Sequence, residues 1–236
     1  MTGDSAGIPF QGRALPSATF AGDDGRPDPE LAQALAGWTA DSLDEVAVVT
    51  ALATARLFVA VVAVADEGTH MALMTVTGVD GRRALPVFTS PEALQRWRPD
   101  ARPVPVPAAR AALSAVAEGC DLLDLDPAGP VPYLVRRPAV WCLGRDLAWL
   151  PSYADPAVAE EMSALAVAQG LLARCERGDA AELRVVLGVP AGLSEDEVRD
   201  VVAGFERAVS RSERVAECVD SLELTLRSLE EPAGPR

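Results

Sequence analysis

The chain has 236 residues, of which 49% are hydrophobic and 24% are charged, and its net charge is −14. This composition is that of an ordinary globular protein, so it excludes disordered and fibrous classes, and the length allows one large domain or two small ones. Both halves are acidic, with 12 Arg against 18 acids in residues 1–150 and 9 Arg against 17 acids in residues 151–236. Because phosphate backbones and anionic membranes bind clustered positive charge, we expect neither nucleic acid nor a membrane as partner.

Missing residue types exclude further mechanisms. The chain has no lysine and no asparagine, and His70 is its only histidine, so Schiff-base chemistry, a P-loop lysine and a multi-histidine metal site are excluded. The four cysteines lie 22 or more residues apart, without a C-x-x-C pair, and indicate free thiols. No secretory signal and no apolar run of about 20 residues is present, so the expected location is the cytoplasm.

The first part of the chain predicts an arm and two helices. Residues 1–26 indicate a loose N-terminal arm, in which Asp23-Asp24-Gly25 is a turn rather than a calcium loop, since the alternating ligand spacing is missing. Asp28-Pro29 is a cap followed by a first-turn proline and predicts a helix to about Ala36. Ser42-Leu-Asp-Glu45 has the pattern of a capping box and predicts a helix from Leu43 to about Ala55.

The next segments predict a sheet. Leu57–Ala65 is apolar on both faces, which is typical of a central strand. Ala72–Val79 alternates, and Asp80-Gly81 joins it to Arg82–Phe88 in a predicted antiparallel hairpin. Thr89 or Ser90 then caps a helix that begins near Pro91, with Leu94 and Trp97 on its inner face.

The remainder of this unit mixes strands and helices. The prolines of Pro103–Pro107 predict an edge strand or an extended link. A helix over Ala108–Glu118 ends at Gly119, and Leu122–Leu125 is a short strand closed by the turn Asp126–Pro130. We expect Tyr133–Leu143 to be the last strand, interrupted near Pro138. The predicted fold class is therefore α+β, with a mixed sheet and flanking helices.

After the linker Leu147–Tyr153, a second and smaller unit follows. A helix opening at Asp155-Pro156, a hairpin over residues 171–189, a helix capped by Ser194 and a strand over Ser221–Arg227 give the order α-β-β-α-β. This order resembles most of a split βαβ sandwich.

Several segments resemble the SseB family, also called enhanced serine sensitivity proteins, in its actinobacterial form. They are Pro86–Ser90, Trp97 and Leu125–Pro130 in the first unit, and Ala181–Gly188 with Asp220–Leu224 in the second. The resemblance implies an N-terminal domain over residues 27–146, a C-terminal domain over residues 147–229 and a tail over residues 230–236. None of these segments has the form of a catalytic motif, so the resemblance implies no catalytic residue, cofactor or metal.

The candidate interaction residues lie where the third predicted strand, Arg82–Phe88, meets the helix that follows it, and in the Asp-Pro turn. A strand end that feeds a helix N-terminus presents free amides to an anion, and the turn could line the same end of the sheet. A capped helix and an ordinary turn explain the same residues structurally. The candidates are Phe88, Thr89, Ser90, Trp97, Asp126, Pro127 and Gly129.

Three function hypotheses follow. The leading one is a cytoplasmic, non-enzymatic adaptor or regulatory protein that binds another protein, with the cleft between its two units as the surface. The second is a small-molecule or anion-binding enzyme that uses His70, Cys142 or Asp126. The third is a structural homo-oligomer built through exposed sheet edges near Pro103–Pro107. Arg136-Arg137 could bind an acidic group, although on a strand they would point to opposite faces.

Overall fold

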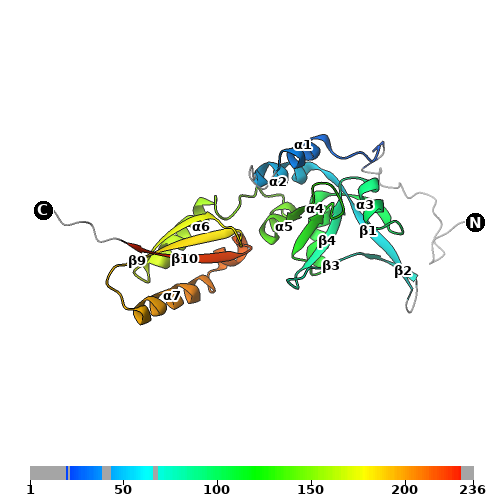
Figure 1. Ribbon diagram of the computed structural model, residues 1–236. Coiled ribbons are helices and arrows are strands. Elements are labelled where there is room, and N and C mark those ends of the chain that lie inside the picture. Colours follow the sequence, from blue (N-terminus) through cyan, green and yellow to red (C-terminus); the bar gives the residue numbers. More distant parts are fainter. Residues whose placement is uncertain (1–19, 21, 39–43, 66–68, 230–236) are drawn as a thin grey trace, which may run out of the picture.

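The structure is a computed structural model that describes residues 20, 22–38, 44–65 and 69–229, with the backbone alone for residues 63–65 and 69–71. The α+β class is confirmed, with helices and two sheets. Figure 1 shows the sheets in two lobes: an N-terminal unit that ends with α5 and a C-terminal unit that begins with α6. Within the described ranges, no helix is both long and apolar enough to cross a membrane.

The N-terminal unit is built on a seven-stranded sheet with the path β2-β1-β4-β6-β7, in which β3 pairs with β4 and β5 pairs with β1. All pairs are antiparallel except β4 with β6. The predicted central strand is confirmed, because β1 pairs with three others. The strands are β1 (Arg56–Ala65), β2 (Thr69–Leu73), β3 (Val76–Thr77), β4 (Arg83–Phe88), β5 (Arg102–Pro107), β6 (Leu122–Leu125) and β7 (Tyr133–Val135).

Helices cover both faces of this sheet. Leu57 and Val59 of β1 belong to a core cluster with α1, α2, α4 and α5, whereas Phe58 and Ala60 belong to a second cluster with α3. This alternation explains why β1 is apolar on both faces. The helices are α1 (Pro29–Gly37), α2 (Glu45–Thr54), α3 (Pro91–Trp97), α4 (Ala108–Ala117) and α5 (Arg137–Gly144).

Most of the predicted local signals act as expected. Asp28 caps α1, Ser90 caps α3, and Gly119 follows α4 with a φ of +69°. Asp80-Gly81 turns the chain between β3 and β4, although the predicted strand Ala72–Val79 is divided, because its first residues pair with β1 instead. The proline strand β5 pairs with β1 alone and is an edge strand.

Two predicted boundaries are wrong. The last strand of the unit ends at Val135, and α5 begins at Arg137, because Pro138 suits the first turn of a helix, where no amide donor is needed. Arg136 and Arg137 are therefore not strand residues. Helix α2 begins at Glu45 and is capped by Asp44, whose Oδ1 accepts from the Ala47 amide at 2.9 Å, while Ser42 lies outside the described residues.

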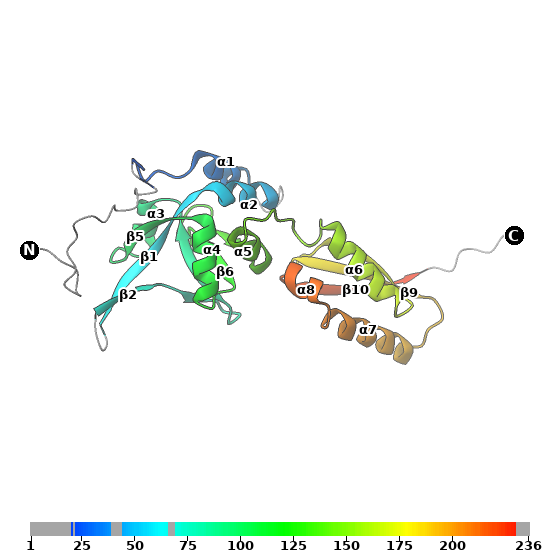
Figure 2. The same cartoon turned by 180° about the vertical axis from the view of Figure 1, so that it is seen from behind.

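The C-terminal unit has a three-stranded sheet in the order β10-β9-β8. Strands β8 and β9 form the predicted hairpin, and β10 runs parallel to β9. The helices lie on one face of the sheet, seen from the strand side in Figure 1 and from the helix side in Figure 2. The elements are α6 (Pro156–Val167), β8 (Leu172–Arg177), β9 (Leu183–Pro190), α7 (Glu195–Val209), α8 (Glu213–Cys218) and β10 (Leu222–Leu229).

The predicted order of this unit is confirmed except for one addition. Ser194 and Glu197 form the predicted capping box of α7. Helix α8 was not predicted; Ser212 caps it by accepting from the Val215 amide. A separate core cluster, centred on Met162, Leu187 and Phe205, fills this unit. The domain bounds given above remain predictions.

Candidate functional site

The structure brings two of the predicted candidate residues into direct contact. Thr89 donates to both carboxylate oxygens of Asp126, from its amide to Oδ1 at 3.0 Å and from its hydroxyl to Oδ2 at 2.7 Å. Thr89 is only 6% exposed and Asp126 only 9%. The end of β4 and the turn after β6 therefore meet, but their polar groups satisfy each other.

Arg56 closes the same cluster from the other side. Its Nη1 donates to the Thr89 carbonyl at 2.8 Å, and its Nε and Nη2 bind the Asp23 carboxylate at 2.6 and 3.0 Å. The guanidinium also lies over the Phe58 ring, 4.2 Å from its centroid. Since Asp23 and Asp24 each accept a bond from the amide two residues on, the Asp-Asp-Gly sequence is a turn here. The cluster fastens the chain before α1 to the sheet.

The other predicted candidates are structural or peripheral. The Ser90 hydroxyl accepts from the Ala93 amide, and Phe88 is fully buried with its ring 5.4 Å from that of Trp97. Pro127 and Gly129 are half-buried in the turn, where the Gly129 amide donates to the Asp126 carbonyl. The predicted recognition surface at this end of the sheet is thus occupied by the protein's own contacts.

Charged side chains, some buried and some partly exposed, gather instead where the two units meet. Glu45 of α2 accepts from Arg136 at 2.8 Å and from Arg177 of β8 at 3.3 Å, so that it binds one arginine of each unit. Arg82 donates from Nη1 to both oxygens of Asp220, at 3.1 and 2.9 Å, again across the junction. These ion pairs hold the units together.

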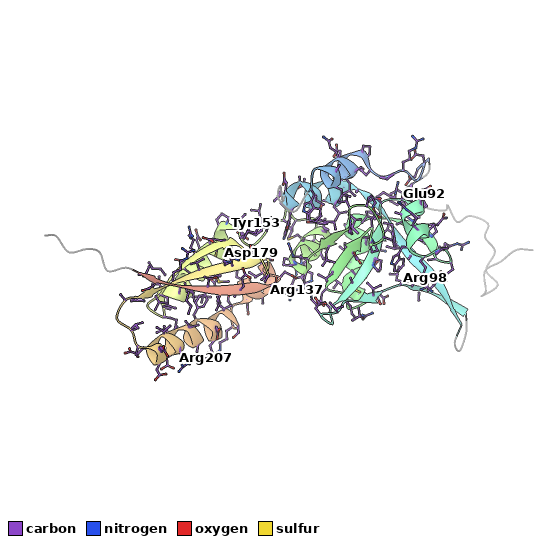
Figure 3. The ribbon with its side chains drawn as sticks, in the orientation of Figure 1. Glu92, Arg98, Arg137, Tyr153, Asp179 and Arg207 are labelled. Carbon is purple, nitrogen blue, oxygen red and sulfur yellow. The ribbon has the colours of Figure 1, made fainter. Side chains whose placement is uncertain are left out.

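Backbone contacts complete this junction. Arg137 Nη2 donates to the carbonyls of Ala216 and Val219 at 3.0 and 3.2 Å, at the C-terminal end of α8, where carbonyls lack helix partners. The buried carboxylate of Glu182 accepts from the amides of Ser152 and Asp220 at 2.9 and 3.0 Å. Figure 3 places Arg137 at the point where the lobes approach.

A polar cavity of about 270 Å³ lies within this network, and we call it the junction cavity. Both units line it, and Figure 3 labels two of its residues, Tyr153 and Asp179, on the side of the C-terminal unit that faces α5. Its lining includes Glu45, Arg82, Leu134, Arg136, Tyr153, Arg177, the turn Gly178–Glu182, Asp220 and Ser221.

A second, more apolar cavity of about 220 Å³ follows the linker between the units, and we call it the linker groove. Trp141 of α5 is half-buried in it, between the guanidinium groups of Arg137 and Arg145, which lie 5.7 and 5.6 Å from its ring centroid. Leu147 and Leu150 line the groove with 56% and 47% of their surface exposed. This surface combines aromatic, arginine and aliphatic side chains.

The residues proposed for an enzyme, His70, Cys142 and Asp126, lie in β2, in α5 and after β6. Cys142 and Cys218 both line the linker groove, and burial raises the pKa of each thiol, which keeps it protonated near neutral pH. Asp126 already accepts at both oxygens. The backbone of His70 pairs with Val64 in the sheet. Across the described ranges, no group of three or more His, Cys, Asp or Glu side chains is placed to hold a metal.

Asp124 of β6 gives a pH-dependent prediction. Burial raises the pKa of its carboxyl above the usual value, so the folded state holds this proton to a higher pH than the unfolded chain does. Stability from this group is present at low pH and is lost as the pH rises through the folded-state pKa. Asp124→Asn should therefore raise the free energy of unfolding at pH 7 and flatten its decline between about pH 4 and pH 7.

Urea unfolding of both proteins across this pH range measures the effect. Asp100→Asn is the matched control, because Arg98 lowers the pKa of that exposed carboxyl. The charge of Asp100 favours the folded state, so removing it should not raise the free energy of unfolding at pH 7. The prediction would be contradicted if Asp124→Asn is less stable than the wild type at pH 7 and its free energy of unfolding declines with pH as steeply as that of the wild type.

Sequence reasoning missed the junction residues. Glu45 was interpreted only as part of a capping box, and Arg82 and Asp220 are separated by 138 positions. No local pattern distinguishes these side chains from the other arginines and acids of the chain. The one partial signal is Arg136-Arg137, for which the sequence allows binding of an acidic group but favours solvated arginines that do not act together. In the structure Arg136 binds the carboxylate of Glu45, and Arg137 binds backbone carbonyls after α8.

The molecule is thus an α+β protein whose two packed units meet at a charged junction beside an apolar groove. Residues 31–142, which span α1 to α5, match the family model described as SseB protein N-terminal domain. This match agrees with the resemblance found in the first unit. No significant match was found among the curated proteins or among the solved structures.

Proposed function

We propose that this chain is a cytoplasmic, non-enzymatic adaptor or regulatory protein that binds another protein through the linker groove. The observation that carries the proposal is Trp141, held between two arginines beside exposed leucines. Trp and Arg are the residues enriched in the energetic centres of protein interfaces. Such a largely apolar surface, with few polar groups, is more typical of a docking site than of an active site.

The tryptophan next to the groove adds support. Trp149 lines both the linker groove and a neighbouring cavity of about 170 Å³ on the other side of the linker. It is only 8% exposed, and within the described residues its indole Nε1 has no hydrogen-bond partner. Trp149 therefore places a second aromatic ring in the wall of the groove, and aromatic residues are enriched at the centres of protein interfaces.

Introducing negative charges into the linker groove tests the proposal. The double variant Leu147→Asp and Leu150→Asp places two charges on the apolar surface without removing a buried contact, so the affinity for the partner should fall by about tenfold or more. The tagged protein is used for affinity capture from its native cytoplasm, and the captured partner is then purified and titrated by calorimetry.

The matched control is Val79→Asp with Leu172→Asp, because both side chains are strongly exposed and lie outside the groove. The control should retain the partner with unchanged affinity. If the groove variant retains the same partner as tightly as the wild type does, the linker groove is not the docking surface.

The homo-oligomer hypothesis has weaker support. Strand β5 is an open edge, but Pro103, Pro105 and Pro107 supply no amide donors for a further strand. Light scattering that gives a mass of about 25 kDa at high concentration would exclude this hypothesis.

We further propose that residues 147–229 form the C-terminal domain of the same family, in its actinobacterial form. The two segments that carry the resemblance lie in neighbouring strands, since Leu183–Pro190 pairs with Leu222–Leu229 throughout. Limited thermolysin digestion should cut first at the exposed Leu147 and Leu150 and release two folded fragments. Initial cutting inside either sheet would contradict this division.

A further inference from the structure

We propose that the junction cavity binds a small anion, a phosphate ester or a dicarboxylate, that bridges the two units. This site is separate from the linker groove and does not depend on the adaptor role. Its basis is a cluster of three arginines, Arg82 and Arg136 from the first unit and Arg177 from the second, that line one cavity.

The difference in exposure decides the sign of the charge that a ligand meets. The side chains of Glu45 and Asp220 are 4% and 3% exposed, whereas their partners Arg82, Arg136 and Arg177 are 37%, 31% and 32% exposed. The carboxylates thus lie behind the guanidinium groups. The three arginines and the two carboxylates of these pairs sum to +1, and the surface that reaches the cavity is rich in cationic N–H donors.

Each of these arginines also has guanidinium N–H groups that its ion pairs do not use. Arg136 uses only Nη1 and Arg177 only Nη2 for Glu45, and Arg82 uses Nε and Nη1 for Asp80 and Asp220. Within the described residues, their other guanidinium N–H groups make no hydrogen bond. A planar fork of free donors is the group that recognises carboxylate and phosphate oxygens.

The remaining acids of the lining do not oppose an anion strongly. Both oxygens of Glu182 accept backbone amides, and Asp179 is paired with Arg184 at the exposed rim. Tyr153, whose ring lies 5.5 Å from the Arg177 guanidinium, supplies a hydroxyl. Burial raises the pKa of this phenol, so it stays protonated and can donate to an anion.

The size of the cavity limits the ligand. Sites for drug-sized molecules occupy about 300 to 1,000 Å³, and the junction cavity is slightly smaller, about 270 Å³. This space suits a compact metabolite better than a nucleotide. Because both units line the cavity, a bound anion adds contacts across the junction, and its binding should raise the melting temperature.

Calorimetric titration of the intact protein with orthophosphate and, separately, with succinate tests the proposal, and thermal unfolding is followed with each probe. We expect saturable binding of at least one probe below about 10 mM, weakened by added sodium chloride. Binding of orthophosphate alone indicates a phosphate ester, and binding of succinate alone a dicarboxylate. Binding of both supports the shared chemistry.

Leu134→Glu is the decisive variant, because Leu134 lines the cavity with 43% exposure and makes none of the junction ion pairs. A carboxylate there should weaken anion binding by about tenfold. Leu226→Glu is the control, since Leu226 is a strand leucine with 47% exposure outside the cavity. It should bind the probes as the wild type does.

If Leu134→Glu fails to fold, Ala180→Glu replaces it, because Ala180 is an exposed residue on the opposite wall. Circular dichroism and unfolding without probe establish that each variant is folded. Absence of saturable binding by both probes, or equal binding by wild type and the cavity variant, would overturn the proposal.

Discussion

Asp126→Ala is expected to lower the free energy of unfolding of the N-terminal unit by about 3 kcal/mol, because two buried donors lose their acceptor at once. The Thr89 amide and hydroxyl bind the two oxygens of this carboxylate at 3.0 and 2.7 Å and have no access to water. Asp126 also has a φ of +49°, which alanine tolerates less well than aspartate. Urea unfolding of the full chain, followed by tryptophan fluorescence, measures the loss.

Asp146 provides a matched control for the backbone contribution. It has a similar φ of +56°, but it is exposed, and within the described residues its side chain makes no hydrogen bond to a buried donor. Asp146→Ala should therefore cost only about 1 kcal/mol. Equal losses at the two positions would mean that the bonds to Thr89 contribute nothing to stability.

Arg136→Ala should be the most damaging single change at the junction. It removes the nearer partner of Glu45, whose side chain is only 4% exposed, and leaves the carboxylate with Arg177 alone at 3.3 Å. Removing one partner of a buried pair costs about 3–5 kcal/mol, and the remaining arginine reduces this to about 2 kcal/mol. The same unfolding experiment measures it.

Two further variants test whether the loss of stability comes from the buried Glu45 carboxylate. Adding Glu45→Gln to Arg136→Ala removes the charge that was left without its partner, so the double variant should recover part of the loss. Arg98→Ala breaks an ion pair with Asp100 whose side chains are 46% and 68% exposed, and it should change the free energy of unfolding very little. A loss at Arg136 no greater than that at Arg98 would contradict a buried ion pair at Glu45.

Those parts of the fold that depend on neighbouring residues could be predicted from the sequence. Ser90 and Ser194 cap the helices that follow them, and Asp80-Gly81 turns a hairpin, because each signal acts within about four positions. Pro138 shows the limit of such reasoning. A proline after a short alternating run is compatible with an interrupted strand and with a helix start, and here packing of α5 against the core decides for the helix.

The candidate site could be predicted only in part, for the same reason. The convergence of Thr89 with Asp126 was expected as a possibility, since both follow strands of one sheet, and β4 and β6 are indeed parallel neighbours. The two hydrogen bonds between Thr89 and Asp126 depend on distances that no sequence pattern encodes. The junction residues come from elements far apart in the chain, such as Glu45 and Arg177, and their pairing follows from how two separate cores are placed.

The position of the junction contacts along the chain determines when they form during synthesis. Ala216, Val219 and Asp220, which receive Arg137 and Arg82, come later in the chain than the whole N-terminal unit. Domains fold as they emerge, N-terminal unit first, so the seven-stranded sheet is complete while its junction arginines still lack these partners. A nascent or prematurely ended chain therefore presents a cationic surface that the finished protein covers, and this surface distinguishes incomplete from complete molecules.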